Sequence, residues 1–134
     1  MLRVKTFLSK SNISGIGVFA AEDISKGTVT WSYSPFFTAV ITPEMLQRMS
    51  AEERMRLDTL DYYWIDSAGN YVISLDHDKF MNHSFAANVE SIDDFTDVAI
   101  RDIKSGEELT IDYRTITPEE TWADYYKNET VKKS

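Results

Sequence analysis

Residues 100–113 read IRDIKSGEELTIDY, and this is the stretch that says most about the fold. Apolar and β-branched residues predict strands at 97–100 and 109–113, and Lys104-Ser105-Gly106 has the composition of a turn between them. On its own, this pattern describes an ordinary hairpin in which Tyr113 is a half-buried aromatic residue.

The remainder of the chain also favours short strands joined by tight turns. Between residues 2 and 41, β-branched and aromatic residues come in short runs that glycines interrupt. The turn-rich stretch 66–70 separates two further strand candidates, 62–65 and 71–75, and predicts a hairpin. The chain is therefore expected to be mainly β, because it lacks the regular alternation of strand and helix that a doubly wound parallel sheet requires.

Capping signals predict three short helices. Thr42-Pro43-Glu44 offers an N-cap followed by proline at the first helical position, and Ser50-Ala51-Glu52-Glu53 is a capping box. Thr117-Pro118-Glu119-Glu120 is another capping box, from which a C-terminal helix over about 118–128 is expected. Two helices are thus expected in the middle of the chain and one near its end.

The length and composition favour a single folded domain. A chain of 134 residues suits one compact core, and a hydrophobic content of 43% argues against a disordered segment. No repeat, low-complexity stretch or linker divides the sequence, so we expect one domain over residues 1–134. The absence of cysteine excludes a disulfide framework and thiolate zinc sites.

The formal net charge of −8 bears on the choice of partner. Phosphate binding requires clustered Lys and Arg, so direct binding of nucleic acid is not expected. A basic protein partner is easier to reconcile with this charge, although acidity that only keeps the protein soluble explains it equally well.

The sequence also carries information on location. It shows neither the apolar region of a signal peptide nor an apolar span of membrane length. We therefore expect no membrane association and a cytoplasmic protein, or a nuclear or host-directed one if the source is eukaryotic, viral or pathogenic.

Residues 15–20, GIGVFA, match the GxGxxG/A pattern of dinucleotide-binding sites. No long crossover helix follows, and the residue about twenty positions further on is Pro35 rather than an acid, so this interpretation is rejected. Two alternatives stay open. The glycines form a turn between strands, or their missing Cβ atoms let the backbone of Gly15 and Gly17 approach a bound ligand closely.

Residues 79–88, KFMNHSFAAN, gather two amides, a hydroxyl and a histidine in one short segment. Ser84 and His83 are poor candidates for a hydrolytic dyad, because adjacent side chains of an extended backbone point to opposite faces. His77 lies between two aspartates, but neighbours at this spacing do not easily converge on an ion. An exposed turn is expected there, and no metal is assigned.

Together and in this order, the segments GIG (15–17), NHS (82–84) and GEELTIDY (106–113) resemble the SET-domain family of protein lysine methyltransferases. The resemblance covers about residues 14–113. Because cysteine-rich flanking modules are missing, the chain is similar to the minimal bacterial and viral members. Two residues depart from the usual family pattern: Phe85 stands in place of cysteine and Ala87 in place of proline.

The resemblance implies a SET-domain fold, in which small curved β-sheets of the β-clip type surround a pseudoknot. The segment bearing Asn82 would pass beneath a loop formed near the C-terminus. A binding site for S-adenosylmethionine is also implied. Gly15, Ile16 and Gly17 would meet the methionine end of the cofactor, while Asn82 and His83 would contact its amino group and adenosine.

Two tyrosines are the catalytic candidates that the resemblance implies. Tyr113 would contact the cofactor beside the transferring methyl group, and would orient a neutral lysine amine rather than act as a base. Tyr33 stands about where many members place a tyrosine that lines the lysine channel, although a core aromatic of the sheet explains it equally well. The C-terminal helix would close the substrate side.

The implied function is transfer of a methyl group from S-adenosylmethionine to a lysine of a basic protein, such as a histone-like tail. We also allow for a homodimer. The alternative is a SET-like module that binds a protein partner and has no catalytic activity.

Overall fold

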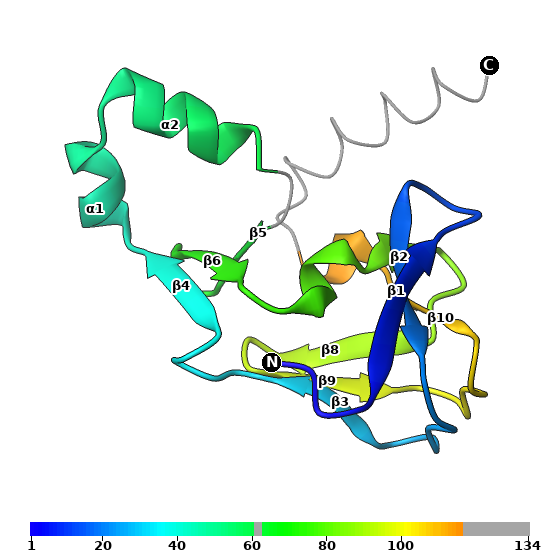
Figure 1. The fold of residues 1–134 in the computed structure, drawn as a ribbon. Helices are drawn as coiled ribbons and strands as arrows, with labels where there is room; N and C mark the ends of the chain where they lie inside the picture. Colours follow the sequence, from blue (N-terminus) through cyan, green and yellow to red (C-terminus); the bar gives the residue numbers. More distant parts are fainter. Residues whose placement is uncertain (61–62, 117–134) are drawn as a thin grey trace.

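Two sheets make up most of the fold in residues 1–60 and 63–116, which are the parts of the chain that this computed structural model describes. The strands of the larger sheet are β1 (Thr6–Lys10), β2 (Ile16–Ala20), β3 (Val29–Ser32), β7 (Asn82–His83), β8 (Val89–Asp93), β9 (Thr96–Ala99) and β10 (Glu108–Ile111). Those of the smaller sheet are β4 (Thr38–Ile41), β5 (Tyr63–Ile65) and β6 (Tyr71–Ser74). The larger sheet has the order β1-β2-β10-β8-β9-β3, with β7 also paired to β10, and the smaller has the order β4-β6-β5 (Figure 1).

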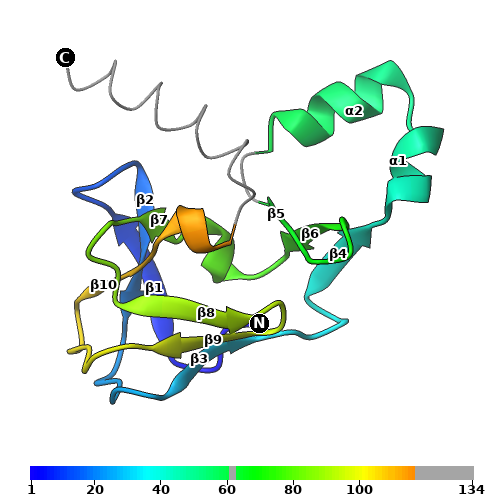
Figure 2. The ribbon, with the colours of Figure 1, turned by 180° about the vertical axis from the view of Figure 1, so that it is seen from behind.

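Strand β10 lies at the centre of the larger sheet. It pairs antiparallel with β2 and parallel with both β7 and β8. In this register Thr110 is opposite Asn82, and Ile111 is opposite His83. The two polar residues of β7 therefore lie beside the strand that leads to Tyr113 (Figure 2).

The hydrophobic core is built around this central strand. Its nine buried side chains, each at most 5% exposed, are Val18, Ala20, Ile24, Met81, Val89, Ala99, Ile103, Leu109 and Ile111. Ile24 and Ile103 also pair through their backbones, with two N–H···O bonds of 2.8 Å. Burial of one such aliphatic side chain stabilises a fold by about 1.5–3 kcal/mol, so the core fixes the position of β10.

A buried asparagine joins β10 to the start of β8. Asn88 is only 2% exposed. Its Nδ2 donates to the carbonyl of Glu108 at 2.8 Å, and its Oδ1 accepts from the amide of Thr110 at 2.9 Å. A buried amide with both ends satisfied is costly to displace, so Asn88 holds the register of β10.

The two mid-chain helices begin where the capping signals predict. Thr42 caps α1 (Pro43–Arg48), and Ser50 caps α2 (Ala51–Asp58). The capping box of α2 is complete, because Ser50 Oγ accepts from Glu53 N at 3.2 Å and Glu53 Oε2 accepts from Ser50 N at 2.8 Å. Between them the two helices bury a single residue, Leu57, so they form an excursion between β4 and β5 (Figure 1).

The predicted hairpin of 62–65 and 71–75 is confirmed over its described part, since β5 and β6 pair antiparallel. The other predicted hairpin is wrong. Strand β9 pairs with β3 and β8, whereas β10 pairs with β2, β7 and β8. A turn does form at Lys104, whose carbonyl accepts from Glu107 N at 3.0 Å. The strands on either side of it diverge because the preceding residue, Ile103, bridges to Ile24.

The expectation that Tyr113 ends a strand is also wrong. Strand β10 ends at Ile111, and Tyr113 begins the short 3-10 helix η2 (Tyr113–Thr115). Asp112 causes this change, because its carboxylate accepts from the amide of Arg114 at 3.0 Å and caps the helix. Strand β8 was not among the predicted strands.

The segment around His77 is a 3-10 helix, η1 (His77–Phe80), rather than an exposed turn. His77 is exposed, but the aspartates on either side are partly buried and bind other parts of the chain. Asp76 accepts from the amide of Leu2 at 2.8 Å, and Asp78 accepts from the hydroxyl of Ser74. Burial raises the pKa of Asp78. The two carboxylates hold elements together instead of converging on one point.

The mainly β fold with short mid-chain helices is confirmed. The parallel pairing of β7 with β10 lies where the resemblance implies that the Asn82 segment meets the C-terminal segment. The helix expected over 118–128 lies outside the described residues. Within residues 1–60 and 63–116, no helix has the length and apolar character that crossing a membrane requires.

Candidate functional site

The loop between β1 and β2 carries the first glycine motif. Gly15 has a φ of +49°, in the left-handed region that residues with a Cβ rarely adopt. Its carbonyl accepts from Ser11 N at 2.8 Å. The buried hydroxyl of Ser11 accepts from the amides of Ile13 (2.9 Å) and Ser14 (3.3 Å). Because its backbone groups are paired in this way, the loop is a defined turn.

Gly17 leaves space for the Glu108 side chain. A Cβ atom at this position would lie 2.1 Å from Glu108 Oε1 and 2.7 Å from Glu108 Cδ, closer than atoms can approach. The φ of Gly17 is not positive, so its backbone conformation does not by itself demand glycine. The interpretation of the motif as a turn is confirmed at Gly15. At Gly17 the close approach is by a carboxylate of the same chain, so approach of a bound ligand stays a prediction.

Asn82 brings the second motif into contact with this loop. Its Nδ2 donates to the carbonyls of Ser14 (3.0 Å) and Ile16 (3.3 Å) and to Glu108 Oε1 (2.9 Å). All three partners can only accept, so the amide must turn its NH₂ group toward them. Its Oδ1 then points away from the loop, and it has no hydrogen-bond partner among the described residues. The side chain thus offers one oriented acceptor.

Glu108 joins three segments that are far apart in the sequence. Its Oε2 accepts from Ser11 Oγ at 2.9 Å, its Oε1 accepts from Asn82, and its side chain lies against Gly17. The motif alone does not distinguish Glu108 from its neighbour Glu107, since both belong to it. Strand alternation was the available signal, because successive side chains of a strand face opposite sides.

His83 and Tyr113 lie in direct contact. His83 Nδ1 accepts from the backbone amide of Tyr113 at 3.1 Å, and the two rings are 5.4 Å apart. A nitrogen that accepts a hydrogen bond carries no hydrogen, so this imidazole is neutral with its hydrogen on Nε2. Asp112 Oδ1 is 3.7 Å from the same Nδ1. The imidazole therefore fixes the point at which the chain leaves β10.

The phenol of Tyr113 is fixed by the residue before Asn82. Tyr113 Oη donates to the carbonyl of Met81 at 2.6 Å. A carbonyl cannot donate, so this bond requires the phenol to keep its hydrogen, and the phenol oxygen can then only accept from a further partner. Such an oxygen can orient an amine, but it does not serve as a base.

An ion pair and aromatic contacts hold the start of η2. Arg114 Nε donates to both oxygens of Asp112, at 2.9 and 3.0 Å, and this hydrogen bonding holds the pKa of the Asp112 carboxyl below its usual value. The Arg114 guanidinium also lies 4.6 Å over the ring of Phe85. Phe85 in turn meets His83 edge-on at 4.6 Å. Phe85, which departs from the family pattern, therefore packs over the imidazole.

Tyr33 lies apart from this cluster. Its side chain is 36% exposed, so the interpretation of Tyr33 as a core aromatic is wrong. Its ring packs edge-on against Phe95, with centroids 5.7 Å apart, and its amide donates to the Phe95 carbonyl at 2.9 Å. Tyr33 therefore belongs to the surface beside the β8–β9 turn, and its place in a lysine channel stays a prediction.

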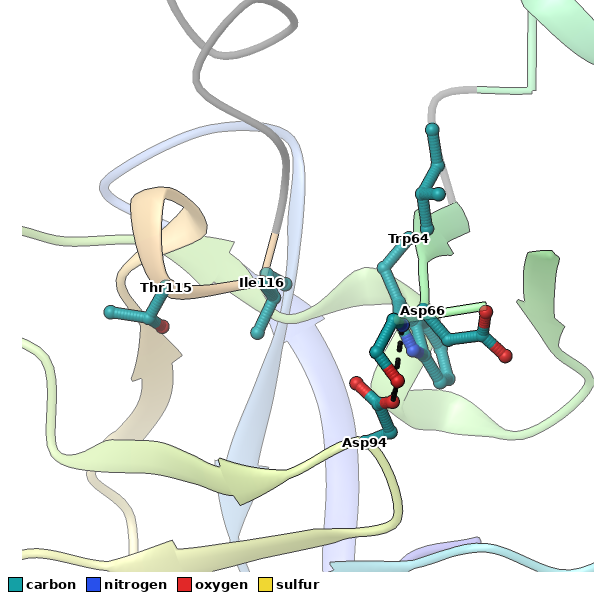
Figure 3. A pocket seen from close by; sticks show the side chains of 7 residues that line it. Trp64, Asp66, Asp94, Thr115 and Ile116 are labelled. Atoms are coloured by element: carbon teal, nitrogen blue, oxygen red, sulfur yellow. Dashed lines mark hydrogen bonds between the residues drawn. The ribbon is translucent and has the colours of Figure 1, made fainter. Parts of the chain in front are cut away.

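A pocket of about 270 Å³ opens between the β5–β6 hairpin, the β8–β9 turn and the end of η2. It is lined by residues 64–67, Asp94, Thr115 and Ile116 (Figure 3). Asp94 lies on the β8–β9 turn, one residue before the Phe95 that packs on Tyr33. Thr115 lies two residues after Tyr113. The pocket thus occupies the space between the segments that carry the two candidate tyrosines.

The structure therefore brings together six of the seven predicted site residues and leaves one outside. Gly15, Ile16, Gly17, Asn82, His83 and Tyr113 belong to one connected set of contacts, and Tyr33 does not share it. Glu108, Met81 and Asp112 complete that set and were not predicted. The arrangement offers a fixed acceptor at Asn82 and a phenol oxygen at Tyr113. Among the described residues, no three acidic or histidine side chains gather as a metal site would require.

Comparison with known sequences agrees with the order of the motifs. A family model described as SET domain matches residues 15–114, which include all three motifs. The comparison with curated proteins finds no match.

Several solved structures are similar to this chain. The Chaetomium thermophilum Polycomb Repressive Complex 2 bound to GSK126 is 26% identical, with a TM-score of 0.68, over 92% of this chain and 17% of that one. The ctPRC2 complex in an autoinhibited conformation bound to S-adenosylmethionine is 26% identical, with a TM-score of 0.68, over 94% and 17% of the two chains. A Plasmodium falciparum protein proposed to be a histone methyltransferase shares the fold at 21% identity, with a TM-score of 0.60, over 84% of this chain and 95% of that one. The chain spans less than a fifth of the length of the Polycomb chains that it matches.

Proposed function

The chain belongs to the SET-domain family, and from this premise we propose that it is an S-adenosylmethionine-dependent protein lysine methyltransferase. One observation carries the proposal. Asn82 and Tyr113 are 31 positions apart in the sequence. Each is held in one orientation by its hydrogen-bond partners, and strand β10 connects the two sets of partners. Such pre-organisation is what a positioned reaction needs, because little remains to be ordered when the reactants bind.

The residues on the GIG side fit the amino-acid end of the cofactor. Asn82 Oδ1 is an acceptor turned away from its own loop, and an ammonium group is a donor that can satisfy it. The Glu108 carboxylate behind Asn82 adds negative charge near that ammonium. S-adenosylmethionine, when bound, supplies a methyl group on a positively charged sulfur.

The residues on the Tyr113 side fit a lysine amine. A free lysine has a pKa of about 10.4, so the amine must lose its proton before it can react. Desolvation and a nearby positive charge both favour that loss, and no dedicated base is needed. Tyr113 keeps its hydrogen on the Met81 carbonyl, so its oxygen is set to accept from the amine and to align it. Correct alignment of two reactants contributes about 7 kcal/mol or more to catalysis.

A basic protein is the proposed substrate. The net charge of −8 favours association with a lysine-rich segment, and the Polycomb structures to which the chain is similar include one in complex with H3K27me3 and H3K27M. A histone-like tail is therefore the first substrate to test. The alternative is a SET-like module that binds such a segment without methylating it.

The test uses the full chain, tritiated S-adenosylmethionine and a panel of basic proteins. We expect label to enter at least one of them, and we expect Tyr113→Phe to lower the rate at least tenfold, because the variant loses the oxygen that aligns the amine. Calorimetry with S-adenosylhomocysteine should show the same affinity for both proteins. Unchanged turnover in Tyr113→Phe would remove Tyr113 from the reaction.

A second variant tests the cofactor side. Asn82→Ala should weaken the binding of S-adenosylhomocysteine by more than about 1 kcal/mol, since the donor of the ligand loses its acceptor. Circular dichroism must show an intact fold for this result to count. Wild-type affinity would contradict the cofactor assignment, and binding of basic proteins without any labelling would favour the non-catalytic alternative.

A further inference from the structure

The pocket beside η2 contains one carboxylate with an unused oxygen. Asp94 Oδ2 accepts from Ser67 N at 3.1 Å and from the Ser67 hydroxyl, whereas Asp94 Oδ1 has no hydrogen-bond partner among the described residues. The second aspartate of the pocket differs, because Asp66 accepts from the amides of Ala68 (3.0 Å) and Asn70 (2.9 Å) and from the Asn70 side chain. Of the two aspartates in the pocket, we therefore take Asp94 as the one that can accept a hydrogen bond from a ligand.

The lining of the pocket also includes an indole and aliphatic side chains. Trp64 lies on one side and Ile116 on the other, with Asp94 between them (Figure 3). The ring of Trp31 meets that of Trp64 edge-on, with the centroids 5.3 Å apart. A volume of about 270 Å³ has room for one long side chain.

A carboxylate next to an indole and aliphatic walls matches the chemistry of arginine. The guanidinium binds a carboxylate through charge-assisted hydrogen bonds, stacks on aromatic rings, and is weakly hydrated compared with an ammonium. Its methylene stem packs on apolar walls. The net charge of −8 favours the same kind of ligand.

The position of the pocket connects it with the proposed lysine site. Thr115 follows Tyr113 by two residues on η2, and Asp94 precedes the Phe95 that contacts Tyr33. An extended peptide advances about 3.3 Å per residue. The side chains to test are therefore those within three positions of a lysine held at Tyr113.

We propose that this pocket binds an arginine that flanks the target lysine, and that Asp94 determines this specificity. The inference rests on the proposed function, because it places the target lysine at Tyr113. It predicts that the protein selects its substrate by the neighbouring sequence as well as by the lysine.

The experiment uses the full chain and short fluorescent peptides with a central lysine in a Gly/Ser/Ala background. Arginine or citrulline, its neutral isostere, is placed at each of the three positions on either side. Binding is measured by fluorescence anisotropy with saturating S-adenosylhomocysteine, and methylation of the same peptides is measured with labelled S-adenosylmethionine. We expect arginine to bind about tenfold more tightly than citrulline at one position, the range of a charge-assisted hydrogen bond.

Three variants isolate the carboxylate. Asp94→Asn keeps an oxygen that can accept from Ser67, so the turn is preserved, and the preference for arginine should disappear. Asp94→Lys should instead prefer a peptide with glutamate at that position. Glu90→Gln, an exposed residue on β8, removes one negative charge elsewhere and should keep the preference for arginine.

The outcomes separate this inference from the proposed function. Peptides that are methylated with no preference for arginine over citrulline would overturn the pocket assignment alone, as would a preference that survives in Asp94→Asn. A preference for arginine that depends on Asp94, without methylation, would keep the pocket and count against the enzyme. Peptides that are neither bound nor methylated would overturn both.

Discussion

At the scale of single residues, Glu108 acts on the site through another side chain. Its Oε1 is one of three acceptors that orient the Asn82 amide, and its Oε2 holds Ser11 at the base of the glycine loop. Glu107, the next residue, instead accepts from Arg101 at 3.2 Å and from the amide of Lys104. Glu108 is therefore a positioning residue, while Glu107 stabilises a turn.

Replacement of Glu108 should affect only ligands that carry the amino-acid group. We expect Glu108→Ala to weaken S-adenosylhomocysteine about tenfold, because Asn82 loses the acceptor that orients it, and Glu108→Gln to recover most of the affinity. Methylthioadenosine lacks the amino-acid group, so calorimetry should show that it binds equally to the unmodified protein and to both Glu108 variants. Glu107→Ala is the matched control and should leave both affinities unchanged. Equal losses for the two ligands would mean that Glu108 only supports the fold.

A substitution at Gly17 tests the same contact, because the Glu108 side chain occupies the space that a Cβ atom at this position would fill. Gly17→Ala should push the carboxylate away from Asn82 and weaken S-adenosylhomocysteine to a similar degree. Since both changes act on the same contact, the double variant Gly17→Ala/Glu108→Ala should be no weaker than the worse single variant. Additive losses in calorimetry would show that Gly17 acts independently of Glu108.

At the scale of elements, strand β10 links the core to the site. Leu109 is fully buried in the core cluster, while the flanking Glu108 faces the glycine loop and Asn82. One strand thus supplies stability on one face and orientation on the other, as alternation of side chains requires. The parallel pairing with β7 then sets Asn82 and His83 at a fixed distance from Tyr113.

A cavity next to β10 should therefore lower the free energy of unfolding more than a substitution at the surface of the sheet does. Leu109→Ala should lower the free energy of unfolding by about 2–5 kcal/mol, because the lost burial adds to the cavity left behind. Ile92→Ala on β8, where the side chain is 57% exposed, is the matched control and should change it by less than about 0.5 kcal/mol. Urea denaturation followed by circular dichroism measures both. Similar effects of the two variants would contradict the central place of β10.

At the scale of the whole molecule, acidic groups from distant segments gather beside the first residues of the chain. Burial raises the pKa of Asp97 to about 6, the Ser91 hydrogen bond opposes this rise, and the nearby Asp78 adds to it. Asp93 contributes in the same direction, and the amino group of Met1 in the opposite one. A raised carboxyl pKa means that the folded state holds a proton at a pH at which the unfolded chain has lost it.

This raised pKa predicts how stability depends on pH. Between pH 3.8 and about 6 the folded state binds more protons than the unfolded chain, so the Asp97 contribution to stability is present at low pH and is lost as the pH rises through about 6. Asp97→Asn should therefore raise the free energy of unfolding by about 1–3 kcal/mol at pH 7.5, with no gain below about pH 4. Urea denaturation at several pH values measures the difference, with Glu90→Gln as control. A gain that is the same at every pH would contradict the assignment to Asp97.

The sequence by itself determined the features that depend on local chemistry and on the order of motifs. The capping box at Ser50 predicts where α2 begins, because all its hydrogen bonds lie within four residues. The turn between β5 and β6 is similarly local. The order of GIG, NHS and GEELTIDY was sufficient to identify the family, and all six predicted residues of the connected set that includes Asn82 and Tyr113 were assigned through motifs that the matched region contains.

Only the tertiary structure decided which segments become neighbours. Strands β9 and β10 are adjacent in sequence but do not pair, because the apolar face of a strand does not specify its partner, and Ile103 finds its own partner in Ile24. Tyr113 lies outside the strand because Asp112 caps a 3-10 helix. Glu108 is a positioning residue because it contacts Asn82 and Ser11, which lie 26 and 97 positions away in the sequence. The pocket at Asp94 likewise exists only where three distant segments meet. Long-range packing fixes such contacts, and no pattern along the chain encodes them individually.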